Sequence, residues 1–181
     1  MTHKTMSHMI DNTAIHNALL HITEEIAKTH EKTDNPVIIG IADGGNEPAR
    51  RIAKLLSDKW KHDVPYGFVN ALFHRDDITQ RTIFKEYMRT EIPISIDNTT
   101  VILVDDVLSS GRTVRAALNE LFDNGRPKCV ELAVLCDLDR KSLPIEANYI
   151  GFKMETNSNE KVKIKLSETD PKNDTLTVEK I

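Results

Sequence analysis

The stretch from Val101 to Thr113, which reads VILVDDVLSSGRT, constrains the fold of this chain more than any other. Its four opening apolar residues predict a strand that is buried on both faces of a parallel sheet. Asp105 and Asp106 come where this strand is expected to end, and a helix with a stop at Asn124-Gly125 is expected to follow the loop. This order predicts an α/β fold that binds its ligand at the carboxyl ends of the strands.

The loop after the acids has the composition of a phosphate site. It contains small hydroxyl residues, one glycine and one cation, namely Ser109, Ser110, Gly111, Arg112 and Thr113. The unpaired N–H groups that begin a helix attract a phosphate when glycine lets it approach. Carboxylates would repel a phosphate, so we expect Asp105 and Asp106 to accept hydrogen bonds from sugar hydroxyls. A ribose 5-phosphate suits both halves of the motif.

Two other interpretations of this motif remain open. The acids and hydroxyls could form a turn that caps a helix, as at many junctions between a strand and a helix. The stretch could also be the metal-binding strand of a nucleoside triphosphatase. That class needs a GxxxxGK[ST] loop, which the chain does not contain.

The motif resembles the phosphoribosyl pyrophosphate motif of type I phosphoribosyltransferases. The segment VILVDDVLSSGRTVRAALNELFDNGRPKCVELAVL, followed by LPIEANYIG, resembles the family of bifunctional pyrimidine operon regulators and uracil phosphoribosyltransferases. Weaker resemblance extends over nearly the whole chain. It implies a doubly wound parallel α/β sheet with a flexible hood, in a single domain of residues 1–181.

The resemblance also implies a reaction and a set of site residues. Uracil and phosphoribosyl pyrophosphate would give uridine monophosphate (UMP) and pyrophosphate, with Mg²⁺ carried by the pyrophosphate and no metal held by the protein alone. A hood from about Arg75 to Pro93 would close over the site. The implied catalytic residues are Asp105, Asp106 and Arg75, and the implied substrate-binding residues are Asp43, Gly44 and Gly45 at the pyrophosphate, Ser109 to Thr113 at the 5-phosphate, and Asp137 at the base.

The pyrophosphate loop departs from the family. The family has Thr-Arg-Gly where this chain has Asp43-Gly44-Gly45, so an anion replaces a cation. Adjacent glycines suit backbone donation to an anion, although a simple turn would select them equally. Because an arginine would bind the departing pyrophosphate, we expect transferase activity to be weak.

A nucleotide-sensing, RNA-binding regulator with little catalysis is the alternative function. The chain has 24 Lys+Arg against 28 Asp+Glu, which favours a small ligand over nucleic acid. The family's basic positions in the first helix are here Leu20, Glu24 and Thr29, and Glu146 replaces a cation near the base loop. These residues disfavour RNA binding. The resemblance also implies a homo-oligomer.

Cellular location and the remaining elements follow from local patterns. No signal peptide or membrane span is recognisable, so we expect a cytoplasmic protein. Cys129 and Cys136 are expected on opposite faces of one strand, unable to pair. We expect helices from near Asp11 or Asn12 and from about Pro48, strands over 37–41, 66–73 and 129–136, and further strands at 149–152 and 162–166, with Lys161, Lys163 and Lys165 on a solvated face.

We expect UMP affinity to depend on Thr113, whose hydroxyl and backbone N–H should both face the phosphate. Replacing Thr113 by Val removes one donor at nearly constant volume. A hydrogen bond to a charged group contributes roughly 1.5–3 kcal/mol, so affinity should fall about 10- to 150-fold. Calorimetric titration with UMP checks this, and an unchanged dissociation constant would place the phosphate elsewhere.

Overall fold

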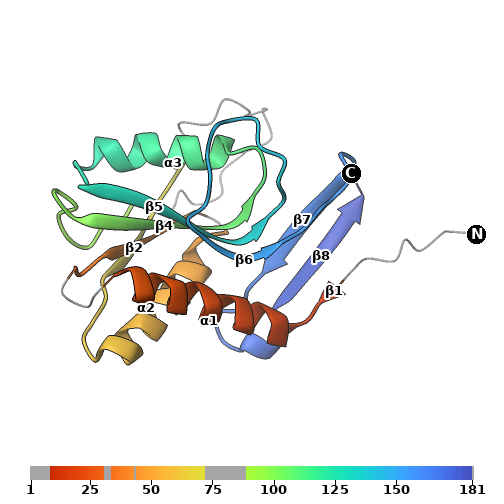
Figure 1. Cartoon of the computed structure of the whole chain (residues 1–181), viewed down its shortest axis with the longest axis horizontal. Coiled ribbons are helices and arrows are strands. Elements are labelled where there is room, and N and C mark those ends of the chain that lie inside the picture. The colour runs from red at the N-terminus through yellow and green to blue at the C-terminus, as the bar shows by residue number, and fades with distance from the viewer. Residues whose placement is uncertain (1–8, 31–33, 43, 72–88, 181) are drawn as a thin grey trace, which may run out of the picture.

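A five-stranded parallel sheet forms the centre of the computed structural model, which describes residues 9–30, 34–42, 44–71 and 89–180 (Figure 1). The strand order is β3-β2-β4-β5-β6, with β2 (Val37–Ile41), β3 (Tyr66–Val69), β4 (Thr100–Leu108), β5 (Cys129–Asp137) and β6 (Tyr149–Lys153). Helices α1 (Asn12–Thr29) and α2 (Asn46–Trp60) cover one face, and α3 (Arg112–Asp123) covers the other. The predicted doubly wound α/β fold is therefore confirmed.

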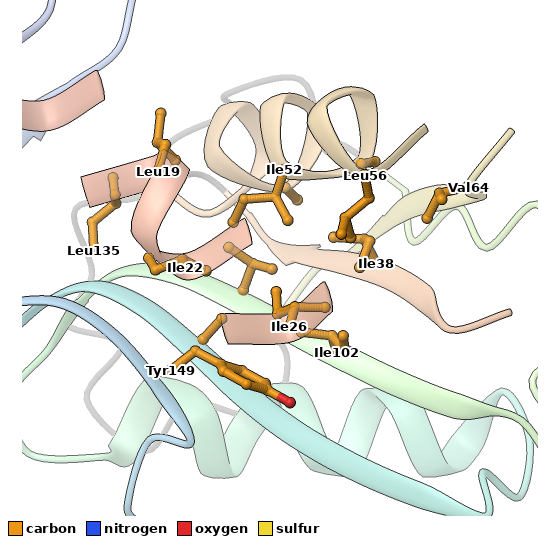
Figure 2. Close-up of a cluster of buried hydrophobic side chains, with 14 of the residues drawn as sticks. Leu19, Ile22, Ile26, Ile38, Ile52, Leu56, Val64, Ile102, Leu135 and Tyr149 are labelled. Carbon is orange, nitrogen blue, oxygen red and sulfur yellow. The ribbon is translucent and has the colours of Figure 1, made fainter. Parts of the chain in front are cut away.

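The apolar run of β2 is buried on both sides, as its sequence predicted. Ile38 packs with the side chains of α1 and α2, whereas Ile39 packs toward α3. Figure 2 shows the first of these clusters, in which Ile22 and Ile26 of α1 meet Ile102 of β4. Alternate residues of one strand thus hold the helices on both faces of the sheet.

The first helix begins where the sequence indicated. The Asp11 side chain accepts a hydrogen bond from the backbone N–H of Ala14 at 2.9 Å, which caps the first turn. The predicted apolar stripe of this helix is fully buried, with Ile15, Leu19, Ile22 and Ile26 each at most 1% exposed. The amphipathic pattern therefore gave both the helix and its packing face.

Several element boundaries differ from the sequence expectations. β3 ends at Val69 because the next backbone N–H, that of Asn70, donates to Thr90 Oγ1 at 3.1 Å; residues 72–73 of the expected strand lie outside the described residues. α2 begins two residues before Pro48, at Asn46.

Trp60, the last residue of α2, is only half-buried and stacks on His62. Both cysteines are free, as expected, but only Cys136 is buried, whereas Cys129 at the start of β5 is exposed and not part of the core.

A second, antiparallel sheet, which we call the small sheet, is formed by strands from both ends of the chain. Its order is β1-β8-β7, with β1 (Met9–Ile10), β7 (Glu160–Lys165) and β8 (Thr175–Lys180), and a short 3₁₀ turn (Pro171–Asn173) precedes β8. Val162 and Leu176 of this sheet pack against Ile15 and Cys136. No helix among the described residues is both long and apolar enough to cross a membrane.

A buried ion pair joins the small sheet to α2. The Arg51 guanidinium donates to both carboxylate oxygens of Asp174, at 2.5 and 3.1 Å, to Ser167 O at 2.7 Å, and to Glu47 Oε1 at 2.7 Å. Asp174 is only 2% exposed and also accepts the Ser167 N–H at 2.8 Å. This bidentate pair fixes the position of the chain between β7 and β8 relative to the N-terminal end of α2.

Replacing Asp174 by Ala should lower the free energy of unfolding by about 3–5 kcal/mol, because Arg51 would keep a buried charge without its bidentate partner. Denaturant unfolding followed by circular dichroism measures this change. The control is Glu155→Ala, which removes an exposed carboxylate and should change stability by less than about 0.5 kcal/mol. Equal stability of the two variants would contradict this role for the pair.

Candidate active site

The two acids of the central motif lie within β4 and not after it. β2 pairs with β4 only as far as Val104, whereas β5 continues to pair with β4 as far as Leu108. The strand expected to stop at the acids is therefore extended by its partner β5. Asp105 and Asp106 lie where one edge of β4 has already lost its neighbour, and successive residues of a strand point to opposite faces.

The carboxylates of these acids have different surroundings. Asp105 is 5% exposed, and its Oδ1 accepts the backbone N–H of Asp106 at 3.0 Å. Asp106 is less buried and lines a hollow. Its burial raises the pKa of the Asp106 carboxyl, against the opposing effects of hydrogen bonds and of the positive charge of Lys161. Asp106 is thus the acid of the pair that faces a possible ligand.

The loop after β2 lies directly against Asp106. A Cβ atom built on Gly44 would lie 2.4 Å from Cγ of Asp106, and one on Gly45 would lie 2.1 Å from the carbonyl oxygen of Val104. Position 45 therefore has no room for a side chain beside the backbone, and a side chain at position 44 would have to displace the carboxylate of Asp106. Asp43, the third residue predicted for this loop, lies outside the described residues.

The hydroxyl loop connects β4 to α3 through a left-handed glycine. Gly111 has φ +84° and precedes the first residue of α3, so a side chain there would be strained. Ser110 O accepts the Ser142 N–H at 3.0 Å, and Gly111 O accepts the Arg115 N–H at 2.9 Å. Arg112, the first residue of α3, is exposed. The loop is therefore held by its backbone, which leaves the hydroxyls of Ser109 and Thr113 at a hollow.

This first hollow, of about 500 Å³, joins the motif to the small sheet. Asp106, Ser109 and Thr113 line it on one side. Strand β7 and Arg140, which follows β5, line the other side. Four cations and two acids therefore surround the space, namely Arg140, Lys161, Lys163 and Lys165 and the carboxylates of Asp106 and Glu160. Its excess of positive charge suits a phosphorylated ligand.

The lysines of β7 are the site residues that sequence reasoning missed. Their alternation with Val162 and Ile164 was visible, and they are exposed as expected. The pattern of one strand cannot show which other element lies beside it, however. The structure places β7 next to the end of β4, and so brings the lysines to the hydroxyl loop.

A second hollow, of about 790 Å³, adjoins the loop after β2. It is bounded by Gly44, Asn46, Glu47 and Arg50 on one side and by Lys165 on another. Arg50 donates two hydrogen bonds to Glu47, at 2.8 and 2.6 Å. Burial alone would raise the pKa of Glu47, but the hydrogen bonds and charges of Arg50 and Arg51 lower it.

Asp137, predicted to meet a base, holds the loop that follows β5. It is 2% exposed, and both of its carboxylate oxygens accept from Lys141 Nζ, at 3.0 and 3.1 Å. The N–H of Asp139 donates to the same carboxylate at 2.9 Å. This pairing raises the pKa of Lys141. A contact between Asp137 and a substrate stays a prediction.

The predicted hood is only partly described. Residues 72–88, which include Arg75, lie outside the described residues. The returning segment pairs with the edge of β3, where the backbones of Phe68 and Glu91 exchange two hydrogen bonds at 2.8 and 2.9 Å. Among the described residues, no group of three or more His, Cys, Asp or Glu side chains could hold a metal ion.

Comparison with known proteins identifies a family model and close relatives. The model of the phosphoribosyl transferase domain matches residues 11–168. The chain is 40% identical over 162 residues to the bifunctional protein PyrR of Pelotomaculum thermopropionicum, covering 90% of both chains. It is also 40% identical to that of Deinococcus radiodurans, covering 90% of this chain and 88% of the relative.

Solved structures share the fold at lower sequence identity. A hypoxanthine-guanine phosphoribosyltransferase from Bacillus anthracis superposes with a TM-score of 0.60 at 22% identity, covering 80% of each chain. A hypoxanthine phosphoribosyltransferase from Trypanosoma cruzi gives a TM-score of 0.62 at 16% identity, covering 85% of this chain and 80% of that one. At these identities the likeness concerns the fold alone.

Replacing Asp106 by Asn should stabilise the ligand-free protein at pH 7. A carboxyl whose pKa is raised by folding destabilises the fold when ionised, so the gain should shrink as pH falls through that pKa. Denaturant unfolding between pH 4 and 7 tests this, with Asp58→Asn on the exposed side of α2 as the control. A less stable Asp106→Asn protein at pH 7 would show that the hydrogen bonds of the carboxylate outweigh its burial.

Proposed function

Because the chain belongs to the phosphoribosyltransferase family, and within it to the PyrR type, we propose that it transfers the phosphoribosyl group of phosphoribosyl pyrophosphate to uracil. The products are UMP and pyrophosphate. The observation that carries this proposal is the cationic hollow that Asp106, Ser109 and Thr113 line together. One hollow thus offers acceptors for ribose hydroxyls and donors for a phosphate.

The two halves of the motif have separate roles in this proposal. Ser109 to Thr113, with the first N–H groups of α3, bind the 5-phosphate. Asp106 accepts hydrogen bonds from the ribose hydroxyls and stabilises the positive charge that develops on the ribose as the leaving group departs. Asp105, whose Oδ1 holds the N–H of Asp106, keeps that residue in place. Mg²⁺ enters with the pyrophosphate of the donor and is part of the substrate.

The expected rate of phosphoribosyl transfer depends on the loop after β2, which in this proposal faces the pyrophosphate. It presents Asp43 and Gly44 where the resembled family presents a threonine and an arginine. An arginine cannot simply be restored at position 44, because even its Cβ atom would displace the carboxylate of Asp106. A contact made mainly in the transition state contributes about 10²–10³ in rate, so we expect slow turnover.

A nucleotide-sensing regulator with little catalysis is the second candidate, and the same loop favours it. Its ligand would be UMP, bound in the first hollow. Direct RNA binding is less favoured, because Glu24 is exposed on α1 and Glu146 is exposed beside Lys141, at 3.6 Å. Two acids on the surface oppose the approach of a phosphate backbone.

The test combines a transfer assay with nucleotide binding. Radiolabelled phosphoribosyl pyrophosphate, Mg²⁺ and a panel of bases should give slow formation of UMP with uracil. Asp106→Asn should lower turnover by about 100-fold and weaken UMP binding much less, because the phosphate is bound elsewhere in the motif.

The control for charge and fold is Asp58→Asn, which should behave as the natural protein. Transfer to another base would replace uracil in the proposal. UMP binding without turnover would favour the regulator, and the absence of both transfer and nucleotide binding would overturn the proposed function.

A further inference from the structure

The pyrophosphate of the donor needs a cation that the loop after β2 does not supply. Arg51 is bound by Asp174 and Glu47 and is only 12% exposed at its side chain, so it is committed to the fold. Arg50 lies in the second hollow, where its Nε and Nη2 atoms donate to the two carboxylate oxygens of Glu47, so an acid already neutralises its charge. Neither arginine of α2 therefore replaces the missing charge.

Lys165 lies where the two hollows meet. It lines the first hollow with Asp106 and Thr113, and the second with Gly44. It is the one basic residue common to both linings among the described residues. Gly44, which lines the second hollow, lies directly against Asp106, so a ribose bound at Asp106 would direct its leaving group toward the hollow that Lys165 also lines.

Of the three alternating lysines of β7, Lys165 is the one best placed to bind an anion in the second hollow. Lys163, two residues earlier on β7, is paired with Glu179 at 2.5 Å. Lys161 lines only the first hollow, which it shares with Asp106, and does not line the second. Lys165 makes no ion pair with the described residues, and it is exposed. An exposed ammonium gives up little in order to bind an incoming anion.

The remaining charges of the second hollow do not cancel this role. Glu47 is bound by both Arg50 and Arg51. Glu168 is the acid that opposes an anion there, since it lines the hollow, is exposed and makes no ion pair among the described residues. Its removal should therefore strengthen the binding of a pyrophosphate, and the removal of Lys165 should weaken it.

We infer that Lys165 binds the pyrophosphate of phosphoribosyl pyrophosphate and stabilises it as it leaves, which rests on the proposed transferase function. The bond between C1 of the ribose and the pyrophosphate oxygen breaks, and its electron pair leaves with the pyrophosphate. N1 of uracil supplies the pair for the new bond and releases its proton to solvent. Lys165 neutralises part of the charge that the leaving oxygen gains.

The test compares two ligands that differ in the pyrophosphate. Calorimetry with Mg²⁺ should show that Lys165→Met weakens binding of phosphoribosyl pyrophosphate about tenfold, because a charge-assisted contact is lost at an exposed position. UMP, which has no pyrophosphate, should lose clearly less affinity than the donor, since Lys165 shares the hollow of UMP but meets no leaving group in it. Lys165→Arg should restore donor binding, and Glu168→Gln should strengthen it.

The matched control is Lys180→Met, which removes an exposed lysine of the same small sheet outside both hollows. It should leave both affinities unchanged. Normal donor binding by Lys165→Met, or an equal loss of donor and UMP binding, would overturn the inference while the proposed function stands. A natural protein that binds neither ligand would instead overturn the proposed function, and the inference with it.

Discussion

The unequal pairing of β4 with its two neighbours is the constraint on which the site depends. Hydrogen bonding to β2 stops at Val104, and hydrogen bonding to β5 continues for four more residues. The open edge beyond Val104 is where the loop after β2 turns away, so Gly44 comes against Asp106. A strand paired equally on both sides would bury its acids in the sheet. Here the ladder holds them rigidly and still leaves Asp106 accessible.

The small sheet places the positive charges of its lysines beside the carboxyl end of β4. Its position relative to α2 is fixed by the pair of Arg51 and Asp174, and its apolar side packs on α1 and β5. As a result Lys161 offsets part of the rise in the pKa of Asp106 that burial causes. This acid and this cation come from distant parts of the chain, so the charge of Lys161 acts on Asp106 only because the small sheet packs beside β4.

The elements that the sequence predicted are those with local causes. A buried apolar run gave β2, and an aspartate cap with an apolar stripe gave α1. The full length of β4 was not predictable, because its last residues are held by β5 and not by their own propensity. Lys165 was read correctly as exposed, but its proximity to the motif depends on the path of the chain from β6 to β7, for which the sequence offers no local signal.

Close packing between Gly44 and Asp106 leaves no room for a cationic side chain at position 44 of the loop after β2. A positive charge for the pyrophosphate would therefore have to come from another element, and the small sheet is the one that lies opposite. The loop cannot gain a side chain at this position without moving the carboxylate of Asp106, which we propose meets the ribose. A lysine on β7 approaches from the opposite side and leaves that contact intact. Under this proposal the cation is only as well placed as the small sheet, so we expect the buried ion pair of Arg51 to contribute to donor binding although it would touch no ligand. If Lys165 binds the donor as proposed, a change that loosens the small sheet should also weaken recognition of the donor.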